Sequence, residues 1–256
     1  MASDGARLFE SLVRKGRSSI GRRGFWGCMQ WAFSNRSYYL SRYCSPLWSL
    51  GTRCAARLER IRFGIDTAGL LHLDNLDIGS RNRHRGMSYE PTRQRRIHKA
   101  LRALAIHDHR DWTFIDLGSG KGRVLLAAAA LPFAKIIGVE FSPELNAIAG
   151  QNIANYRGHV RCPRIELVCA DAAEWRFPDG KLVVYLYNPF DVNVLMGVRA
   201  NLEMSLRAHH RDVYVIYVTP AWKEIFDESS LFTPHRSSWT LGIWRTREPG
   251  RVRARS

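Results

Sequence analysis

The stretch Thr113-Phe-Ile-Asp-Leu-Gly-Ser-Gly-Lys-Gly122 is the most informative part of this chain. Its first half is a short apolar run that predicts a buried strand, and its second half carries glycine at every other position. Glycines at a strand end let the backbone turn sharply and let a ligand approach where a Cβ atom would block it. A helical pattern follows over residues 123–131 and stops at Pro132. The stretch therefore predicts a strand, a tight turn and a helix whose first N–H groups can face an anionic group.

Strand and helix patterns alternate from this point onward. Apolar runs predict strands over residues 113–117, 135–139, 165–169, 182–187, 213–218 and 238–244. Helical patterns cover residues 93–106, 123–131, 143–156, 192–206 and 222–226. Ser142 is expected to cap the third of these helices, with Pro143 at its first position. This alternation is typical of an α/β fold with a parallel, doubly wound sheet.

Two common glycine loops do not fit the stretch. A dinucleotide fingerprint, G-x-G-x-x-G, needs a glycine at position 123, where this chain has Arg123. A P-loop needs Ser or Thr after its lysine, but Lys121 is followed by Gly122. The acid Asp116, two residues before the first glycine, instead suits a ligand that carries a cationic group.

Acidic residues also follow the next two predicted strands. Glu140 ends the second strand, where a carboxylate accepts hydrogen bonds from ribose hydroxyls. Asp171 follows the third strand and is placed to accept a hydrogen bond from the amino group of an adenine. Each acid alone has a simpler interpretation as a solvated loop residue, and Glu140 alone also fits an NAD enzyme. Three acids in register with one glycine loop together favour a ligand site.

This ordered set resembles the class I, Rossmann-like methyltransferases that use S-adenosylmethionine (SAM). The resemblance covers residues 88–244, and bacterial methyltransferase-domain proteins with Asp-Leu-Gly-Ser-Gly-Lys-Gly-Arg are especially similar. It implies a mostly parallel, seven-stranded sheet whose last strand, Ser238–Trp244, runs antiparallel. It implies SAM as cofactor, bound by Asp116, Gly118, Ser119, Gly120, Gly122, Glu140, Phe141, Asp171, Ala172 and Asn188.

The fourth predicted strand is followed by Asn188-Pro189-Phe190. This tripeptide resembles the (Asp/Asn)-Pro-Pro-(Tyr/Phe) motif of N-methyltransferases, with one proline missing. In that motif the amide oxygen and the next carbonyl accept hydrogen bonds from the target nitrogen, and the aromatic ring packs the substrate. The resemblance implies that these three residues are catalytic and that the acceptor is a nitrogen of a protein, of the lysine type, or of a small molecule. The alternative is a simple strand-to-helix turn that Asn188 caps and Pro189 bends.

Tyr89 and Glu90 precede the first helix of the region of resemblance. Related proteins have a segment here that closes over the cofactor, which implies a lid over SAM or substrate. A plain loop into the helix is the alternative. Taken together, the patterns divide the chain into a basic, aromatic-rich N-terminal extension over 1–78, a methyltransferase domain over 79–244 and a basic tail over 245–256.

The net charge of +16 lies outside the predicted catalytic region. Residues 1–60, 81–110 and 245–256 carry +8, +7 and +4, whereas residues 111–244 carry −1. Such flanks can contact an anionic surface, which leaves an RNA methyltransferase open as an alternative. A non-enzymatic membrane-surface or assembly module acting through residues 24–50 is the third choice. Arginine bias alone also explains the charge, because 33 of the 39 basic residues are Arg.

The remaining composition excludes several classes of protein. Five cysteines, an odd number with no Cys-x-x-Cys pair, argue against a disulfide framework or a zinc site and favour a reducing cytoplasm. The histidines at apparent helix ends are typical of solvated residues, so no metal is expected. No apolar run reaches the length of about 18 residues that a transmembrane helix needs, and no secretory signal is evident.

Overall fold

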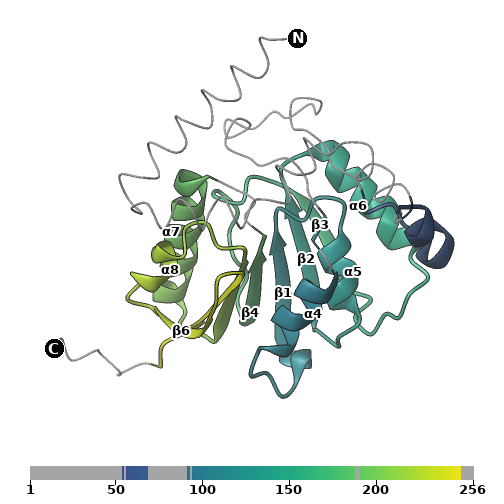
Figure 1. Ribbon diagram of the computed structural model, residues 1–256. Helices are drawn as coiled ribbons and strands as arrows, with labels where there is room; N and C mark the ends of the chain where they lie inside the picture. The colour runs from purple at the N-terminus through teal and green to yellow at the C-terminus, as the bar shows by residue number, and fades with distance from the viewer. Residues whose placement is uncertain (1–53, 55, 69–90, 93, 188–190, 249–256) are drawn as a thin grey trace, which may run out of the picture. The chain divides into compact units, whose positions relative to one another are not determined.

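The computed structural model describes residues 54, 56–68, 91–92, 94–187 and 191–248, all of which belong to the unit Leu50–Ser256 (Figure 1). Its helices are α4 (Gln94–Arg102), the 3₁₀ turn η3 (His109–Asp111), α5 (Arg123–Ala129), α6 (Pro143–Asn155), α7 (Val192–Ala208) and α8 (Glu224–Asp227), with one more over residues 56–63. Its strands are β1 (Trp112–Leu117), β2 (Lys135–Glu140), β3 (Ile165–Cys169), β4 (Lys181–Leu186), β5 (Val213–Val218), β6 (Phe232–Ser237) and β7 (Leu241–Thr246).

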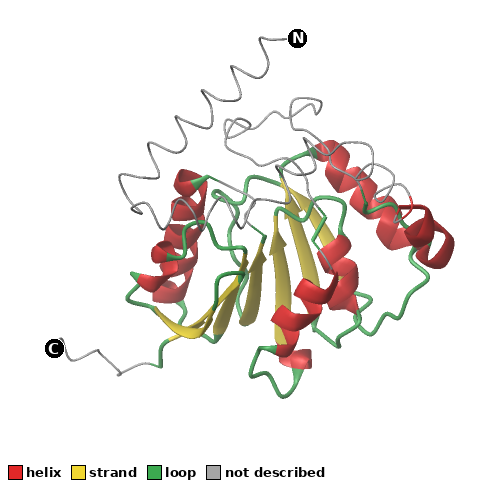
Figure 2. Cartoon of the chain, viewed as in Figure 1, coloured by secondary structure: helices red, strands yellow, loops and turns green. Residues whose placement is uncertain are grey.

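The seven strands form one sheet in the order β3-β2-β1-β4-β5-β7-β6 (Figure 2). Strands β1 to β5 are parallel, while β7 runs antiparallel to β5 and β6 antiparallel to β7. The strand order reverses between β1 and β4, and ligands bind at such a switch point, beyond the carboxyl ends of the strands. The predicted fold, a mostly parallel seven-stranded Rossmann-like sheet, is confirmed.

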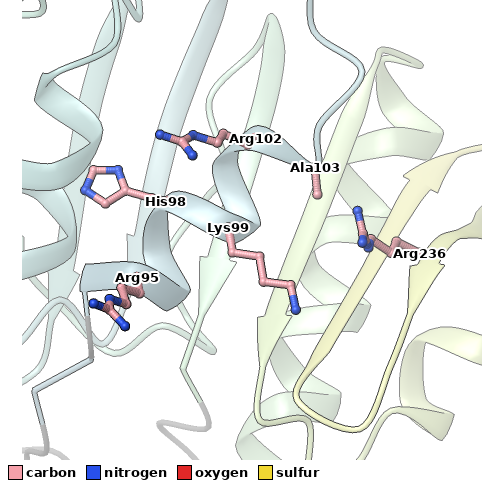
Figure 3. Close-up of a pocket in the computed structure, with 6 residues that line it drawn as sticks. All are labelled: Arg95, His98, Lys99, Arg102, Ala103 and Arg236. Atoms are coloured by element: carbon pink, nitrogen blue, oxygen red, sulfur yellow. The ribbon is translucent and has the colours of Figure 1, made fainter.

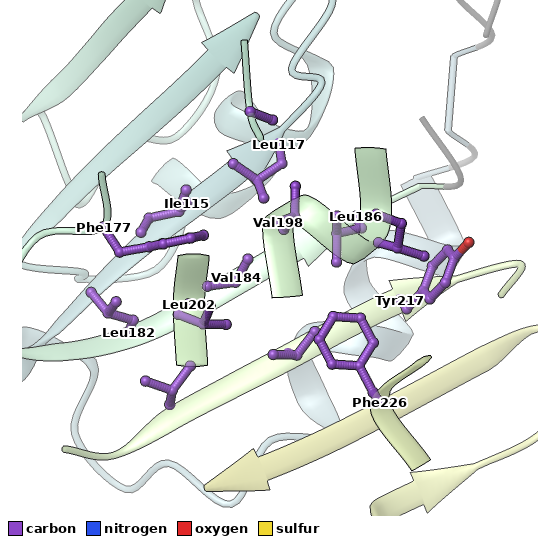
Figure 4. Close-up of a cluster of buried hydrophobic side chains, with 14 of the residues drawn as sticks. Ile115, Leu117, Phe177, Leu182, Val184, Leu186, Val198, Leu202, Tyr217 and Phe226 are labelled. Carbon is purple, nitrogen blue, oxygen red and sulfur yellow. The ribbon is translucent and has the colours of Figure 1, made fainter. Parts of the chain in front are cut away.

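Helices cover both faces of the sheet. On one face, α7 and α8 pack onto alternate residues of the central strands, as Leu202 and Phe226 do against Val184 and Tyr217 (Figure 4). On the other face, α4 and α5 cover the intervening positions, among them Phe114 and Tyr185. Because successive strand residues point to opposite faces, β1 places Asp116 on the α5 face and Leu117 on the α7 face. Burial on both faces explains why these strands are continuous apolar runs.

Two local predictions need correction. The last strand begins at Leu241 and not at Ser238, because residues 238–240 form a turn that Ser238 N closes on Leu241 O at 2.8 Å. Strand β6 was not predicted at all. It lies at the edge of the sheet, only its first residue is buried, and it contains Pro234 beside a bulge, so it has no alternating apolar pattern.

The start of α6 agrees with its predicted cap. Ser142 is the N-cap residue, its hydroxyl accepts a hydrogen bond from Leu145 N at 3.3 Å, and Pro143 is the first helical residue. Helix α4 is shorter than predicted and ends at Arg102, although Leu104 beyond it is still buried. Among the described residues, no helix combines the length and apolar character needed to cross a bilayer.

Gly122 sets the start of α5, and replacing it is expected to destabilise the protein. Its φ of +82° is left-handed, and an added Cβ would lie 3.2 Å from the Cβ of Ala149 on α6. We expect Gly122→Ala to lower the free energy of unfolding by about 1–2 kcal/mol. The measurement is urea denaturation followed by circular dichroism.

Gly150→Ala is the matched control for this substitution. Gly150 lies inside α6, and its added Cβ would meet only Leu167 Cδ1, at 3.7 Å. Alanine is the better helix former by about 0.8–1.0 kcal/mol, so this variant should be at least as stable as the parent. Equal stabilities of the two variants would show that the turn does not require glycine at position 122.

Candidate functional site

The three predicted acids gather at one edge of the sheet. Asp116 is near the end of β1, Glu140 ends β2, and Asp171 follows β3 by two residues. The register pairs Asp116 with Gly138, and Glu140 with Cys169. Parallel neighbouring strands in this register end at the same edge, as the sequence analysis expected.

The glycine loop wraps around the end of β2. Gly118, Gly120 and Gly122 all have left-handed φ values, of +78°, +53° and +82°. The backbone N–H groups of Gly118 and Ser119 donate to Val139 O at 2.8 and 3.2 Å. Residues with a Cβ rarely adopt these conformations, so the three glycines account for the tight path of the loop.

Glu140 holds this loop and the start of α6 together. Its side chain is buried, Oε2 accepts a hydrogen bond from Gly120 N at 2.8 Å, and Oε1 accepts one from Ser142 N at 3.0 Å. Burial raises the pKa of Glu140, although these backbone donors act against the rise. A carboxylate has about four acceptor positions, so Glu140 retains capacity for the hydroxyl groups of a ribose.

Asp116 is a buried acid near the carboxyl end of β1. Only 3% of the residue is exposed, and no described residue donates a hydrogen bond to its carboxylate. Burial, and then the charge of Glu140, raise the pKa of Asp116 well above its ordinary value. An isolated buried carboxylate is unfavourable unless it is neutral or faces a cation. The site therefore suits a ligand that brings a positive group to Asp116.

Ser119 depends on a glycine that the sequence analysis did not select. The Ser119 hydroxyl is buried and makes no hydrogen bond with any described residue. A Cβ added to Gly138 would lie 2.9 Å from Ser119 Oγ and 2.6 Å from Leu125 Cδ1. Gly138 thus makes room for the loop, and its signal in the sequence was a glycine inside a predicted buried strand.

The residues beyond Glu140 and β3 are placed at the same edge. Phe141 follows Glu140 and is half-buried, and Ala172 is buried against the α7 face. Asp171 starts a turn, since its Oδ1 accepts a hydrogen bond from Ala173 N at 3.0 Å. Asp171 therefore shapes its own loop in addition to the ligand role expected of it.

Five of the predicted site residues lie outside the described residues, namely Tyr89, Glu90, Asn188, Pro189 and Phe190. The flanks of the last three are described: β4 ends at Leu186, and α7 begins at Val192. Asp191 is the N-cap residue of α7, and its Oδ1 accepts hydrogen bonds from Asn193 N and Val194 N, both at 3.0 Å. In the alternative interpretation of the tripeptide as a simple turn, the capping role given to Asn188 is therefore wrong, because Asp191 is the N-cap residue.

A buried lysine and its neighbours support the glycine loop from behind. Lys121 is 7% exposed, and its Nζ donates to Ala68 O at 3.0 Å. Arg123, in the first turn of α5, forms a largely buried ion pair with Glu59 at 2.5 Å. Residues 56–68, which the sequence analysis assigned to the N-terminal extension, thus contact the loop directly.

Asn152 of α6 completes this support. Its side-chain amide donates to Lys121 O at 2.9 Å and to Asp66 O at 3.2 Å, while its oxygen accepts from Asp66 N at 2.8 Å. These contacts join residues that are 31 and 86 positions apart in the chain. No local pattern of the sequence indicates them.

Tyr185 on β4 lies beside Asp116 on the α5 face. The residue is fully buried, and its hydroxyl makes no hydrogen bond of acceptable geometry with any described residue, although Thr92 and Arg96 lie close to it. Burial, and then the nearby Asp116 carboxylate, raise the pKa of Tyr185 well above its ordinary value. Thr92, and Arg96 of α4, therefore approach the same edge of the sheet as the glycine loop.

Residues 114–203 match a family model described as a methyltransferase domain. No curated protein sequence is similar enough to this chain to match it. The match runs from the third residue of β1 through most of α7, and so includes the glycine loop and all three acids.

Several solved structures are similar to this chain. One is the ribosomal protein L11 methylase of Lactobacillus delbrueckii subsp. bulgaricus, with 17% identity over 59% of this chain and 77% of that chain, and a TM-score of 0.42. Another is an RNA methyltransferase from Salinibacter ruber in complex with S-adenosyl-L-homocysteine. It has 20% identity, covering 64% of this chain and 97% of that chain, and a TM-score of 0.43. A predicted N6-adenine-specific DNA methylase from Listeria monocytogenes has 16% identity over 62% of this chain, about half of that chain (52%), and a TM-score of 0.46.

Proposed function

Because this chain is a class I SAM-dependent methyltransferase, whose methyltransferase domain matches over residues 114–203, we propose that it transfers the methyl group of SAM to a nitrogen atom. The observation that supports the cofactor site is Asp116, a buried acid to which no described residue donates a hydrogen bond, beside three left-handed glycines. The nitrogen preference is supported by Asn188-Pro189-Phe190, which follow the strand that ends at the switch point of the sheet.

The described residues fit SAM. Asp116 suits its ammonium group, the remaining acceptor positions of Glu140 suit the ribose, and Asp171 suits the adenine amino group. When bound, SAM supplies a methyl group on a sulfonium, which is an excellent leaving group. The main task of the protein is then to place the acceptor in line with that methyl group.

In this proposal the amide oxygen of Asn188 and the carbonyl of Pro189 accept hydrogen bonds from the acceptor nitrogen. This holds the nitrogen lone pair toward the methyl group, while Phe190 packs against the acceptor. Tyr89 and Glu90 would close over the site. The methyl acceptor in this proposal is a lysine-type protein nitrogen, a small molecule or RNA.

The test combines two measurements on the full chain. Isothermal titration calorimetry with SAM should show one site, and a folded protein that binds no SAM at millimolar concentration would contradict the proposal. Tritiated SAM is then incubated with cell extract and the protein, and the labelled material is digested separately with protease and with nuclease. The digestion that releases the label identifies the acceptor class.

Glu140→Gln is expected to weaken SAM binding about 10- to 100-fold, because hydrogen bonds to a charged acceptor contribute about 1.5–3 kcal/mol. In the parent, the carboxylate accepts hydrogen bonds from Gly120 N and Ser142 N. The NH₂ group of the glutamine would face one of these two N–H groups, so that a donor meets a donor. Calorimetric titration measures the effect. Glu144→Gln, on an exposed residue in the first turn of α6, is the matched control and should bind SAM like the parent. Equal affinities of the two variants would remove Glu140 from the site.

A further inference from the structure

Basic side chains line an open groove of about 510 Å³ between α4 and β6 (Figure 3). The lining residues are Arg95, His98, Lys99, Arg102, Ala103 and Arg236. Four of these six carry a fixed positive charge, one is a histidine, and none is acidic. Figure 3 shows Lys99 extending from α4 toward the side on which Arg236 lies. The groove is therefore a concentrated positive site.

The charges in this groove are not neutralised by the described part of the protein. Arg95, Lys99, Arg102 and Arg236 form no ion pair or side-chain hydrogen bond with any other described residue. By contrast, the largely buried Arg123 forms an ion pair with Glu59. Unpaired like charges that share a groove repel one another, and an anionic ligand relieves that repulsion.

The groove begins at the edge of the sheet that holds the glycine loop. Arg96, the neighbour of Arg95 on α4, donates to Thr219 Oγ1 at 3.3 Å, and Thr219 directly follows β5. Arg96 also lies close to Tyr185, the neighbour of Asp116. A ligand in the groove can thus extend along α4 to the cofactor edge.

An exposed aromatic residue lies at the same edge. Trp239 is 71% exposed and stands in the turn between β6 and β7. Thr219 N donates to Thr240 O at 2.9 Å, which places this turn beside the carboxyl end of β5. Among the large hydrophobic residues that the structure describes as exposed, Trp239 is the only aromatic one. An exposed indole at the same edge of the sheet as a basic groove can bind an unpaired base by stacking.

We propose that this groove binds a single-stranded nucleic acid, with phosphates on the α4 and β6 cations and a base on Trp239. The bound strand is the methyl acceptor, an assignment that rests on the proposed function. A single strand fits better than a duplex, because its unstacked bases are free to pack on an indole. A membrane or an acidic protein segment can also neutralise these cations, but a nucleic acid carries a planar base beside every phosphate, which matches the cations and Trp239 together.

The binding test uses fluorescence anisotropy with labelled oligouridylate and oligothymidylate of about 12 nucleotides, a length within the usual range for such sites. The groove variant is Lys99→Gln, Arg102→Gln and Arg236→Gln in one chain. The control is Arg161→Gln, Arg164→Gln and Lys223→Gln, which removes the same charge from exposed residues outside the groove lining. Comparing the two oligonucleotides shows whether RNA or DNA is preferred.

The groove variant is expected to bind at least about tenfold more weakly, and the slope of log affinity against log salt should fall by about 2, near 0.7 for each lost phosphate contact. The control variant should lose less than about threefold and keep its slope. Equal losses in the two variants, or no binding by the parent protein, would overturn the proposal.

Trp239 has its own pair of variants. Trp239→Ala should weaken binding at least about fivefold without changing the salt slope, because stacking on a base is uncharged. Trp239→Phe keeps an aromatic face and should restore most of the affinity. Unchanged binding by Trp239→Ala would remove the stacking contact from the proposal.

Calorimetry with SAM on the parent and on the groove variant separates this inference from the proposed function. SAM binding without oligonucleotide binding would overturn the proposal for the groove and leave the proposed function standing. Oligonucleotide binding without SAM binding would contradict the proposed function and leave the groove as a nucleic-acid site. With both bound, tritium from SAM should appear in nuclease-sensitive material and be lost in the groove variant. Label found only in protease-sensitive material would overturn the acceptor assignment.

Discussion

Asp116→Asn is expected to weaken SAM binding at least about 100-fold while making the cofactor-free protein more stable. The asparagine keeps the shape of the side chain but removes the charge that, in the proposed function, faces the ammonium group of SAM. It also removes a carboxylate that is 3% exposed and accepts no hydrogen bond from the described residues, so the cost of ionising it in the folded state disappears. The same change therefore lowers function and raises stability.

The stability gain depends on pH in a direction that follows from the raised pKa. Burial, and then Glu140, raise the pKa of Asp116 in the folded protein above its unfolded value. The protonated carboxyl therefore favours folding below the unfolded pKa of about 3.9, and this contribution is lost as pH rises through the folded pKa. The variant does not titrate there, so its advantage over the parent should increase with pH across that window.

Two measurements check this prediction. Calorimetric titration gives the SAM affinity, and thermal unfolding without SAM gives Tm from acidic to alkaline pH. About 1 kcal/mol corresponds to about 2–4 °C in a chain of this size, so we expect a gain of at least about 2 °C at alkaline pH. Asp179→Asn, at an 80% exposed side chain, is the control and should change neither quantity. Normal SAM binding by Asp116→Asn would contradict the site.

Asn188→Ala is expected to lower the rate of methyl transfer at least about 100-fold and to change SAM affinity by less than about tenfold. In the proposed function the amide oxygen orients the acceptor nitrogen, and the loss of such a positioning contact lowers kcat more than it lowers cofactor binding. Incorporation of tritium from SAM into acceptors of a cell extract gives the rate, and calorimetry gives the affinity.

Two further variants test whether the role belongs to this side chain. Asn188→Asp keeps an oxygen in place and should retain more activity than Asn188→Ala. Asn193→Ala, five residues later and in the first turn of α7, should transfer methyl groups at the parent rate. An unchanged rate in Asn188→Ala would favour a structural turn and remove the basis for preferring nitrogen.

The sequence predicted the central part of the fold because its strands are buried on both faces. Strands β1 to β5 are continuous apolar runs, and each is followed by a helix or turn with recognisable boundary residues. Strand β6 has one buried residue in six and a proline, so it left no such pattern. This edge strand could not be predicted, because its position depends on three-dimensional packing and not on a local sequence pattern.

In the candidate site, too, the features with a local sequence pattern were predictable and the contacts between distant residues were not. Asp116, Glu140 and the glycines were predictable, because parallel strands bring their carboxyl ends together wherever the topology is known. The partners of Lys121 and Arg123 were not, because Ala68 and Glu59 lie 53 and 64 positions away. The orphan hydroxyl of Tyr185 was hidden as well, since a tyrosine inside an apolar strand looks like any other buried aromatic.

The ties between residues 56–68 and the glycine loop decide where this chain can be shortened. A fragment that began at residue 79 would lose Glu59 and Ala68, and with them the partners of two largely buried cations, Arg123 and Lys121. Both cations would then lack their partners at the glycine loop, which is the proposed cofactor site. Limited proteolysis between the helix over 56–63 and α4 would therefore disable the enzyme once the pieces separate, although Asp116, Glu140 and Asp171 all stay on the larger piece.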